Sequence, residues 1–371
     1  MKLADLPTPC LVLDRRALHR NLDAMERAVG RHGVALRPHM KTAKSIDVAR
    51  LAMARPAARR GGGITVATLA EAEYFVGHGI TDVLLTVGIT PQKLEQVAKL
   101  NATGATVAVV TDDPDTAAAI AALPAPPRAL IEIDCGQNRS GLAPGDPAVL
   151  EVARKLGPAF AGVMSHAGHS YGGRAPQEMR GYAEAERSAV VTAVEDLAAA
   201  GFRSQIVSVG STPTALYAGS LHGITEVRAG VYMFGDLFQS EIGSHPPGDI
   251  AVTVLASVIG RRPAQQALMI DAGALALSMD RSTEATAHDY GYGLMLDLDG
   301  RRSFGAAIVR RVWQEHGRVE LDPAHAATLP VGAKVRIAPN HVCHTAAAHD
   351  RYFVVDEDDT VVAIWPRING W

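Results

Sequence analysis

The chain has 371 residues, of which 47% are hydrophobic and 20% are charged, and its formal net charge at pH 7 is −3. That length is too great for one small core and predicts about two domains. The composition excludes a disordered chain, and the balanced charge argues against nucleic acid or an anionic membrane as a partner.

The N-terminus and the cysteines bear on the compartment. The first residues, MKLADLPTPC, lack the apolar core of a signal peptide, and no apolar run is long enough to span a bilayer. The three cysteines, Cys10, Cys135 and Cys343, are scattered and odd in number, which argues against a disulfide framework. We therefore expect a cytoplasmic protein with no membrane partner.

From residue 15 onward, short β-branched or apolar runs alternate with longer, alanine-rich amphipathic stretches. Several of these stretches begin with Ser, Asp or Pro, as helix capping favours. Strands that alternate with helices pair in parallel, and eight such units predict a closed (β/α)8 barrel over residues 15–244. An open doubly wound sheet is the alternative, although no GxGxxG motif follows the first strand. The eight strand candidates are 34–39, 63–68, 82–87, 106–111, 129–134, 160–166, 205–210 and 225–230.

The texture of the chain changes after about residue 245. Short strand-like runs follow one another, separated by Gly, Pro, Asn or Asp, with little helical periodicity, which predicts a mostly antiparallel β domain. The opening run TPCLVLD also has strand character, and we expect it to join this domain. The predicted β domain therefore comprises residues 1–14 and 245–371.

In a barrel of this type, functional side chains collect at the carboxyl ends of the strands. Those ends place Lys41 after the first strand, Arg139 in the loop after the fifth and His166 at the end of the sixth. The loops after strands seven and eight, where barrels commonly bind phosphate, contain GSTPT (210–214) and RAGVYMFGD (228–236). Their glycines and hydroxyls suit a phosphate site, although such residues in loops usually reflect turn chemistry alone.

The segment PNHVCH places His341 and Cys343 two positions apart, followed by His344. If the segment is extended, the side chains of His341 and Cys343 share one face and that of His344 faces away. Imidazole and thiolate together favour zinc, and two protein ligands suit a catalytic ion that keeps open positions. The alternative is a chance pair, since HxC is a short pattern.

Nine motifs extend from residue 8 to residue 343: TPCLVLD, RPHMKTAK, IEIDCGQNRSG, SHAGHSYG, SVGSTPT, AGVYMFGD, IDAGALALS, QEHG and PNHVC. In this order they resemble the D-serine dehydratase / D-threonine aldolase family, a group of pyridoxal phosphate enzymes of the alanine racemase-like type. RPHMKT and PNHVC are the most specific of them. The resemblance implies the same barrel and trailing β domain, pyridoxal 5'-phosphate as cofactor, and a homodimer.

The resemblance assigns roles to particular residues. The first lysine of RPHMKTAK carries the cofactor as a Schiff base, which implies Lys41 and leaves Lys44 as a solvated neighbour. A lysine must be neutral to form that bond and to take a proton, which a position beside a cofactor favours. His166 matches a residue that contacts the cofactor ring or its nitrogen, with a satisfied core histidine as the alternative. Arg139 matches an arginine near the cofactor's phenolic oxygen, with a structural ion pair as the alternative.

The other implied cofactor contacts are Tyr171, Ser211, Thr212, Gly230 and Val231, the last through its backbone. The resemblance also places a metal ion at PNHVC, beside the cofactor. Dehydratase members of the family carry His-x-Cys there and aldolase members His-x-Asp. The cysteine of this chain therefore favours dehydration and Zn2+, with another divalent ion as the alternative.

The resemblance thus implies a lyase that converts a small D-3-hydroxy amino acid to a 2-oxo acid and ammonia. D-Serine, D-threonine and 3-hydroxy-D-aspartate are all candidate substrates, and Arg174 or Arg281 is a candidate partner for a second carboxylate. Retro-aldol cleavage to glycine and an aldehyde is the main alternative, and racemisation requires a second base that the sequence does not identify. A non-catalytic pyridoxal phosphate carrier is disfavoured, because such carriers typically lack the β domain and the metal motif.

Overall fold

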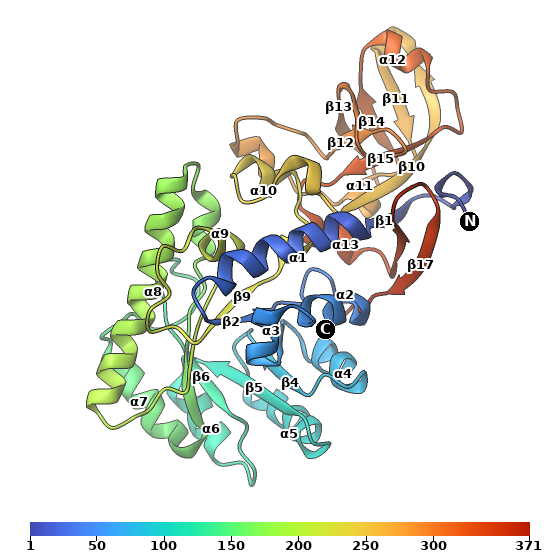
Figure 1. Cartoon of the computed structure of the whole chain (residues 1–371). Coiled ribbons are helices and arrows are strands. Elements are labelled where there is room, and N and C mark those ends of the chain that lie inside the picture. The colour runs from blue at the N-terminus through green and yellow to red at the C-terminus, as the bar shows by residue number, and fades with distance from the viewer. The chain divides into compact units, whose positions relative to one another are not determined.

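The computed structural model describes residues 1–371 (Figure 1). The chain divides into two compact units. The barrel unit comprises Asp23–Gly230 and the last two residues, and the β unit comprises Met1–Leu22 and Val231–Asn369. The domain limits at residues 15 and 245 come from the change in residue pattern along the sequence and stay a prediction.

Eight parallel strands form the sheet of the barrel unit. Their order is β2-β9-β8-β7-β6-β5-β4-β3, and a parallel bridge between His39 and Thr65 joins its two ends. This closure confirms the predicted (β/α)8 barrel, and each strand lies within one of the eight predicted runs. The strands are β2 (Ala35–Pro38), β3 (Ile64–Val66), β4 (Asp82–Leu85), β5 (Thr106–Thr111), β6 (Ala129–Glu132), β7 (Phe160–Met164), β8 (Ile206–Val209) and β9 (Glu226–Ala229).

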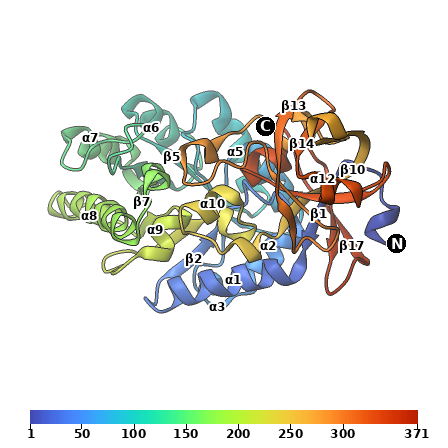
Figure 2. The ribbon, with the colours of Figure 1, turned by 90° about the horizontal axis from the view of Figure 1, so that it is seen from above.

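Helices connect these strands, and α6, α7 and α8 lie on the outer side of the sheet (Figures 1 and 2). The sequence of α7 explains its limits: the Asp146 side chain accepts a hydrogen bond from the Ala148 N–H, and Pro147 opens the first turn. Helix α1 (Arg15–Gly30) precedes β2 and begins in the β unit. The connecting helices are α2 (Ile46–Met53), α3 (Pro56–Gly61), α4 (Leu69–Gly77), α5 (Leu94–Ala102), α6 (Pro114–Ala121), α7 (Pro147–Leu156), α8 (Pro176–Ala199) and α9 (Thr212–Tyr217).

A nine-stranded, mostly antiparallel sheet forms the β unit, as predicted. Its order is β11-β14-β13-β12-β15-β10-β1-β16-β17. The strands are β1 (Cys10–Asp14), β10 (Val252–Arg262), β11 (Ala267–Ile270), β12 (Leu294–Leu296), β13 (Ser303–Val312), β14 (Gly317–Glu320), β15 (Lys334–Ala338), β16 (Arg351–Val355) and β17 (Val361–Pro366). The helices are α10 (Leu237–Glu241), α11 (Ala274–Leu277), α12 (Pro323–Ala327) and α13 (Val342–Ala347).

Strand β1 joins this sheet, as its apolar run predicted. It pairs antiparallel with β10, Cys10 opposite Leu255, and parallel with β16, Leu11 opposite Tyr352. The sequence did not indicate β12 or β13. In β13 only Ala307 and Val309 are buried, so the run carries little of the apolar signal that marks a strand.

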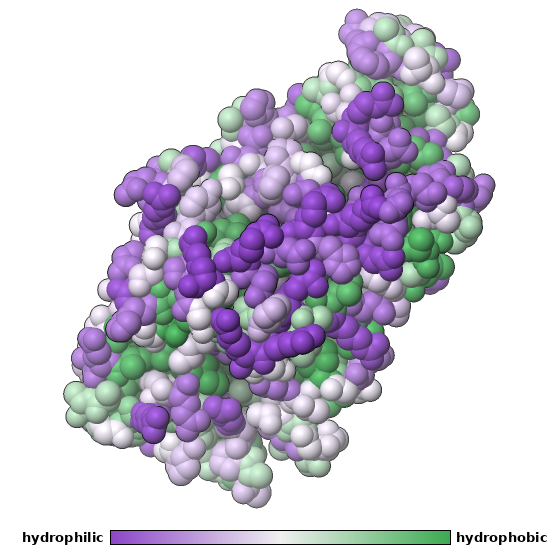
Figure 3. Space-filling view, in the orientation of Figure 1, coloured by the Kyte–Doolittle hydropathy of each residue, from purple (hydrophilic) through white to green (hydrophobic).

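No helix of the protein is both long enough and apolar enough to cross a membrane. On the face drawn in Figure 3, hydrophilic side chains predominate and apolar ones gather in small patches. None of the three cysteines, Cys10, Cys135 and Cys343, forms a disulfide.

Candidate active site

Lys41 lies in a tight turn directly after strand β2. The Met40 N–H donates to the Thr65 carbonyl at 2.8 Å, and the Lys44 N–H donates back to the Met40 carbonyl at 2.7 Å. Met40, Thr42 and Ala43 are fully buried, whereas the Lys41 side chain is exposed. The turn therefore presents one primary amine at the carboxyl end of the barrel.

Lys44 is not the solvated neighbour that the sequence suggested. Its Nζ lies 3.1 Å from Oε1 of the buried Glu71, and its side chain is only 16% exposed. Its φ of +48° lies in the left-handed region, which turns the side chain toward α4. The ion pair with Glu71 distinguishes Lys44 from Lys41.

His166 lies at the end of β7. Its Nδ1–H donates to the Gly210 carbonyl at 2.7 Å, which leaves Nε2 with a free lone pair. Burial and the nearby charge of Lys41 lower the pKa of His166 to about 3, and Arg139 and Arg228 add to the effect. The imidazole is therefore neutral at physiological pH, and three cationic side chains surround it.

Arg139 follows β6 in a turn organised by Asp134, whose carboxylate accepts the N–H groups of Gly136 and Gln137 at 3.0 and 2.9 Å. Its Nη2 lies 3.5 Å from Oε1 of Glu132, and its side chain is 51% exposed. Such a long contact at an exposed guanidinium contributes little to stability. The ion pair therefore leaves Arg139 able to act on a ligand.

The loops after β8 and β9 approach other backbone very closely. A Cβ on Gly210 would lie 1.9 Å from the Arg228 carbonyl, and one on Gly230 would lie 2.6 Å from the His39 carbonyl. Ser211 and Thr212, both buried, follow Gly210 directly. The glycines thus bring small hydroxyl side chains to the strand ends, a composition that fits a phosphate group.

The loop after β7 joins the same region. Ser170 Oγ lies 2.9 Å from Ser211 Oγ. Tyr171 is half-buried in a short helix, Gly168–Gly172, that contains Ser170. Val231, the remaining predicted contact, is buried and is the first residue of the second segment of the β unit. The structure thus brings Ser170 and Ser211 together, and Tyr171 directly follows Ser170 in the chain.

Glu186 of α8 is a buried acid that the sequence reasoning missed. Its carboxylate accepts the N–H groups of Ala167 and Gly210, both at 2.9 Å, and the hydroxyl of Thr214 at 2.7 Å. Burial raises the pKa of Glu186, and these hydrogen bonds oppose that rise. One carboxylate therefore fixes the loop after β7 to the loop after β8. The signal in the sequence was its helical spacing from Ala183 and from the other residues of the buried stripe.

The metal motif is helical, not extended. His341 is the residue before α13, and Cys343 and His344 lie in its first turn. His344 does not face away from His341: their ring centroids are 4.1 Å apart, because residues three apart share a helix face. The condition of an extended segment, on which His344 would face away, is therefore not met.

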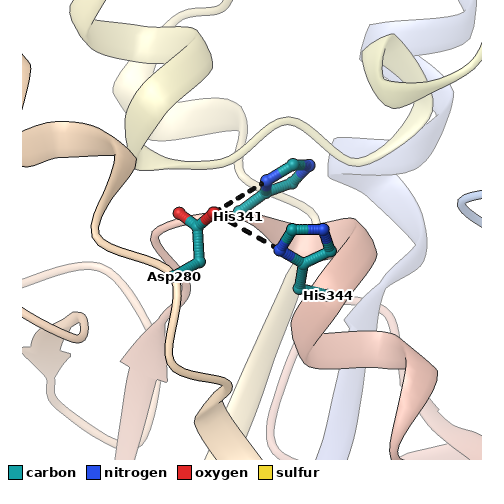
Figure 4. A group of neighbouring side chains, drawn as sticks. All are labelled: Asp280, His341 and His344. Atoms are coloured by element: carbon teal, nitrogen blue, oxygen red, sulfur yellow. Dashed lines mark hydrogen bonds and ion pairs between the residues drawn. The ribbon is translucent and has the colours of Figure 1, made fainter.

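Asp280 completes a cluster with these two histidines (Figure 4). Its Oδ2 lies 3.3 Å from Nδ1 of His341 and 3.3 Å from Nδ1 of His344. The possible ligand atoms of the three residues lie within 4.8 Å of one another. Cys343 is not in that group of three, but it forms a hydrogen bond with His341. No periodicity in the sequence marked Asp280.

The charges of this cluster are strongly coupled. Burial lowers the pKa of His341, but hydrogen bonds with Asp280 and Cys343 raise it to about 11. Burial likewise opposes ionisation of Asp280, yet hydrogen bonds from His341 and Ser282 hold its pKa well below the ordinary range. An ion that binds His341 must therefore displace a proton from it.

Two further polar residues hold this segment in place. Asp236 caps α10 through the Gln239 N–H at 2.7 Å and accepts the Val342 N–H at 3.0 Å. Burial raises the pKa of Asp236 to about 6, and the charge of His341 opposes that rise. Asn340, fully buried, donates to the carbonyls of Asp280 and Gly291 at 3.0 and 2.9 Å. These bonds account for the asparagine of the PNHVC motif.

Arg174 of the barrel unit and Arg281 of the β unit already have partners. Arg174 Nη1 donates to the carbonyls of Tyr171 and Gly173, and Arg281 Nη2 lies 2.9 Å from Asp289 Oδ2. Their proposed pairing with a substrate carboxylate stays a prediction.

Comparison with known proteins identifies two family models. One, described as the alanine racemase N-terminal domain, matches residues 13–237, and one described as a putative serine dehydratase domain matches residues 251–355. The D-serine dehydratase of Dictyostelium discoideum is 28% identical over 396 residues, covering 99% of this chain and 98% of the relative. The 3-hydroxy-D-aspartate aldolase of Paracoccus denitrificans (strain Pd 1222) is 30% identical over 384 residues, with 99% and 92% covered.

The D-threo-3-hydroxyaspartate dehydratase of Delftia sp. (strain HT23) is 41% identical over 382 residues, covering 100% of this chain and 99% of the relative. Its solved structure has a TM-score of 0.96 at 40% identity and covers 100% of both chains. Two further structures of a D-threo-3-hydroxyaspartate dehydratase also have a TM-score of 0.96. One carries alanine in place of a histidine, and the other, in a metal-free form, carries alanine in place of a cysteine two positions further along.

Proposed function

Because the chain belongs to the family that joins an alanine racemase N-terminal domain to a serine dehydratase domain, we propose that it is a D-3-hydroxy amino acid dehydratase. Its proposed substrate is D-threo-3-hydroxyaspartate, and its proposed cofactors are pyridoxal 5'-phosphate and Zn2+. One observation carries the proposal: His341 and Cys343 are spaced as the substituted histidine and cysteine of the solved dehydratase, whose cysteine variant is metal-free.

The residues of the barrel unit fit pyridoxal phosphate. Lys41 offers an exposed primary amine, and Lys41, Arg139 and Arg228 make the surroundings of His166 cationic, as an anionic cofactor requires. The phosphate would be held by Ser211 and Thr212 together with the backbone of Gly230 and Val231. When bound, the cofactor's ring delocalises the negative charge that develops at the substrate α-carbon.

The donor set of the β unit fits a metal ion. An imidazole and a thiolate are ligands that zinc prefers, and two protein ligands leave positions for a substrate hydroxyl. When bound, the ion polarises that hydroxyl as a Lewis acid. His341 and Cys343 would hold it. The Asn340 side chain before them and the Val342 N–H between them are held by hydrogen bonds, which limits how far the two ligands can move.

The chain's own groups supply the proton transfers. The Lys41 amine removes the α-proton. The neutral His166 does not protonate that amine, because its Nδ1–H is hydrogen-bonded to the Gly210 carbonyl. The Cβ–O bond then breaks with its electron pair going to oxygen, and the departing hydroxide takes up the proton that Lys41 removed and leaves as water. The released enamine tautomerises to an imine, whose hydrolysis gives the 2-oxo acid and ammonia.

Product analysis tests this proposal. We expect the protein loaded with pyridoxal phosphate and zinc to convert D-threo-3-hydroxyaspartate to oxaloacetate and ammonia in equal amounts. Aldolases occur among its relatives, and glycine with glyoxylate would establish retro-aldol cleavage instead. Recovery of the other stereoisomer would indicate racemisation, and no reaction with this substrate, D-serine or D-threonine would overturn the assignment as an enzyme of this class.

A homodimer is also part of the proposal, since the family resemblance implies one. Light scattering after size-exclusion chromatography measures the mass directly, and a monomer at micromolar concentration would contradict it.

A further inference from the structure

Both carboxylate oxygens of Asp280 have partners, and the carboxylate faces His341 and His344 (Figure 4). Oδ1 accepts the N–H of Ser282 at 2.9 Å and its hydroxyl at 2.5 Å. Oδ2 faces Nδ1 of His341 and Nδ1 of His344, each at 3.3 Å. The Asp280 side chain is only 15% exposed, so its orientation is fixed by the protein and not by solvent.

The consequence for His341 is a choice between its two ring nitrogens. A neutral imidazole carries one proton, and a carboxylate at Nδ1 holds that proton there. Nε2 is then the nitrogen with a free lone pair, which is the atom that can bind a metal ion. Histidines that bind metals usually donate their other N–H to a carboxylate or a carbonyl, and this outer partner fixes the orientation and the tautomer of the ring.

From this arrangement we propose that Asp280 is the positioning residue of the metal site. It accepts the Nδ1–H of His341 and thereby turns Nε2 toward an ion shared with Cys343. The inference rests on the metal site of the proposed function and adds to it a residue that touches neither the ion nor the substrate.

The main chain supports this role. The Asp280 carbonyl accepts from the Asn340 side chain at 3.0 Å, and Asn340 directly precedes His341. Asn340 Oδ1 in turn accepts the hydroxyl of Thr283 at 2.6 Å. The loop that carries the carboxylate and the segment that carries the imidazole are therefore held together twice, once through the side chain and once through the backbone.

The alternative is a three-ligand metal site, in which Asp280, His341 and His344 bind the ion directly. Two observations favour the positioning role. His341 forms a hydrogen bond with Cys343, so the imidazole reaches the thiol as well as the carboxylate. The His344 side chain is 60% exposed, against 33% for His341, so its contact with Asp280 is the less enclosed of the two.

Zinc affinity separates the two arrangements without any measurement of turnover. The protein is loaded with pyridoxal phosphate, stripped of metal, and titrated with Zn2+ in competition with a chromophoric chelator. For Asp280→Ala we expect the dissociation constant to rise by about 10- to 100-fold, as for other outer partners of metal-binding histidines. Asp280→Asn keeps an acceptor oxygen, so we expect a smaller rise, and His344→Gln should change the constant by less than about threefold.

Asp297→Asn is the matched control. Asp297 lies in the same unit, its side chain is also 15% exposed, and it accepts hydrogen bonds from Arg301 and Arg302. We expect its zinc affinity to equal that of the unchanged protein. An effect of Asp280→Ala no larger than that of Asp297→Asn would overturn the inference. An equal loss in His344→Gln and Asp280→Ala would establish the three-ligand site instead.

Cobalt substitution gives a second readout. In Asp280→Ala loaded with Co2+, the thiolate-to-metal charge-transfer band should persist, because Cys343 remains a ligand. Loss of that band would contradict a purely positioning role. If the unchanged protein binds no Zn2+, the proposed metal site itself fails, an outcome distinct from any effect of Asp280.

Discussion

The barrel unit and the β unit hold their functional side chains by different means. In the barrel unit, Lys41, His166 and Ser211 follow strand ends whose positions the parallel sheet determines, with glycines where backbones nearly touch. In the β unit, His341 and Cys343 lie at a short helix that depends on buried polar side chains, among them Asp236 and Asn340. We therefore expect that substituting one functional residue of the barrel unit leaves the others in position. In the β unit, by contrast, the positions of His341 and Cys343 depend on a few side-chain hydrogen bonds that single substitutions can remove.

The largest effect should come from Lys41→Ala, which removes chemistry but leaves the barrel intact. Because the other amine of that turn, Lys44 Nζ, is paired with the buried Glu71, we expect turnover to fall by about 1,000-fold or more, as loss of a nucleophile and general base predicts. The assay is oxaloacetate formation from D-threo-3-hydroxyaspartate, with the absorbance of bound cofactor recorded in parallel. The exposed Lys99→Ala on α5 is the control and should keep full activity. Substantial turnover by Lys41→Ala would refute the assignment.

Glu186→Ala should have the largest effect on the stability of the barrel unit, because the Glu186 carboxylate joins the loop after β7 to the loop after β8. Three buried donors lose their acceptor, so we expect the free energy of unfolding to fall by about 3 kcal/mol, measured by urea denaturation. Glu184→Ala, two residues earlier and 57% exposed, should change it by less than about 0.5 kcal/mol. Similar free energies of unfolding for the two variants would mean that the loops after β7 and β8 keep their conformation without Glu186.

Unlike Glu186→Ala, Cys343→Ala should strongly reduce zinc affinity while changing the free energy of unfolding little. We expect zinc affinity to fall by more than about 100-fold, the upper end of what loss of an outer-shell partner produces. Elimination activity should fall with it, while the unfolding free energy of the metal-free protein should change by less than about 1 kcal/mol, because the thiol is half-buried. Full elimination activity in metal-free Cys343→Ala would refute the Lewis-acid role.

The smallest effect concerns His166 and pH. Its pKa in the folded protein is about 3, below the ordinary value of 6.5, so the unfolded chain binds more protons between those values. Stability from this group is therefore complete above about pH 6.5 and is lost as the pH falls toward 3. Between pH 5 and pH 7.5, the urea midpoint of the cofactor-free protein should rise more than that of His166→Gln. Equal rises would show that the ring is solvated in the folded protein.

The sequence predicted a feature correctly where more than one pattern marked the same segment. Most barrel strands were marked twice, by their own apolar run and by the amphipathic helix beside it, and all eight predicted runs contain a strand. Lys41 could be placed because a strand end defines a position. The conformation around His341 could not, because a six-residue segment carries no periodicity, and a β context suggested an extended chain where helix α13 forms. Asp280 and Glu186 were missed because single acids acquire their roles only when distant segments fold onto them.

Strand β1 has a consequence for how the protein is made. The strand pairs on one side with β10 and on the other with β16, yet it is synthesised first. At ribosomal rates of roughly 5–20 residues per second, its second neighbour emerges about 340 residues later, tens of seconds after β1 itself. The whole barrel is translated in the interval. The β unit is thus completed only after the barrel, and a fragment that begins after the barrel would lack a strand from the interior of its sheet.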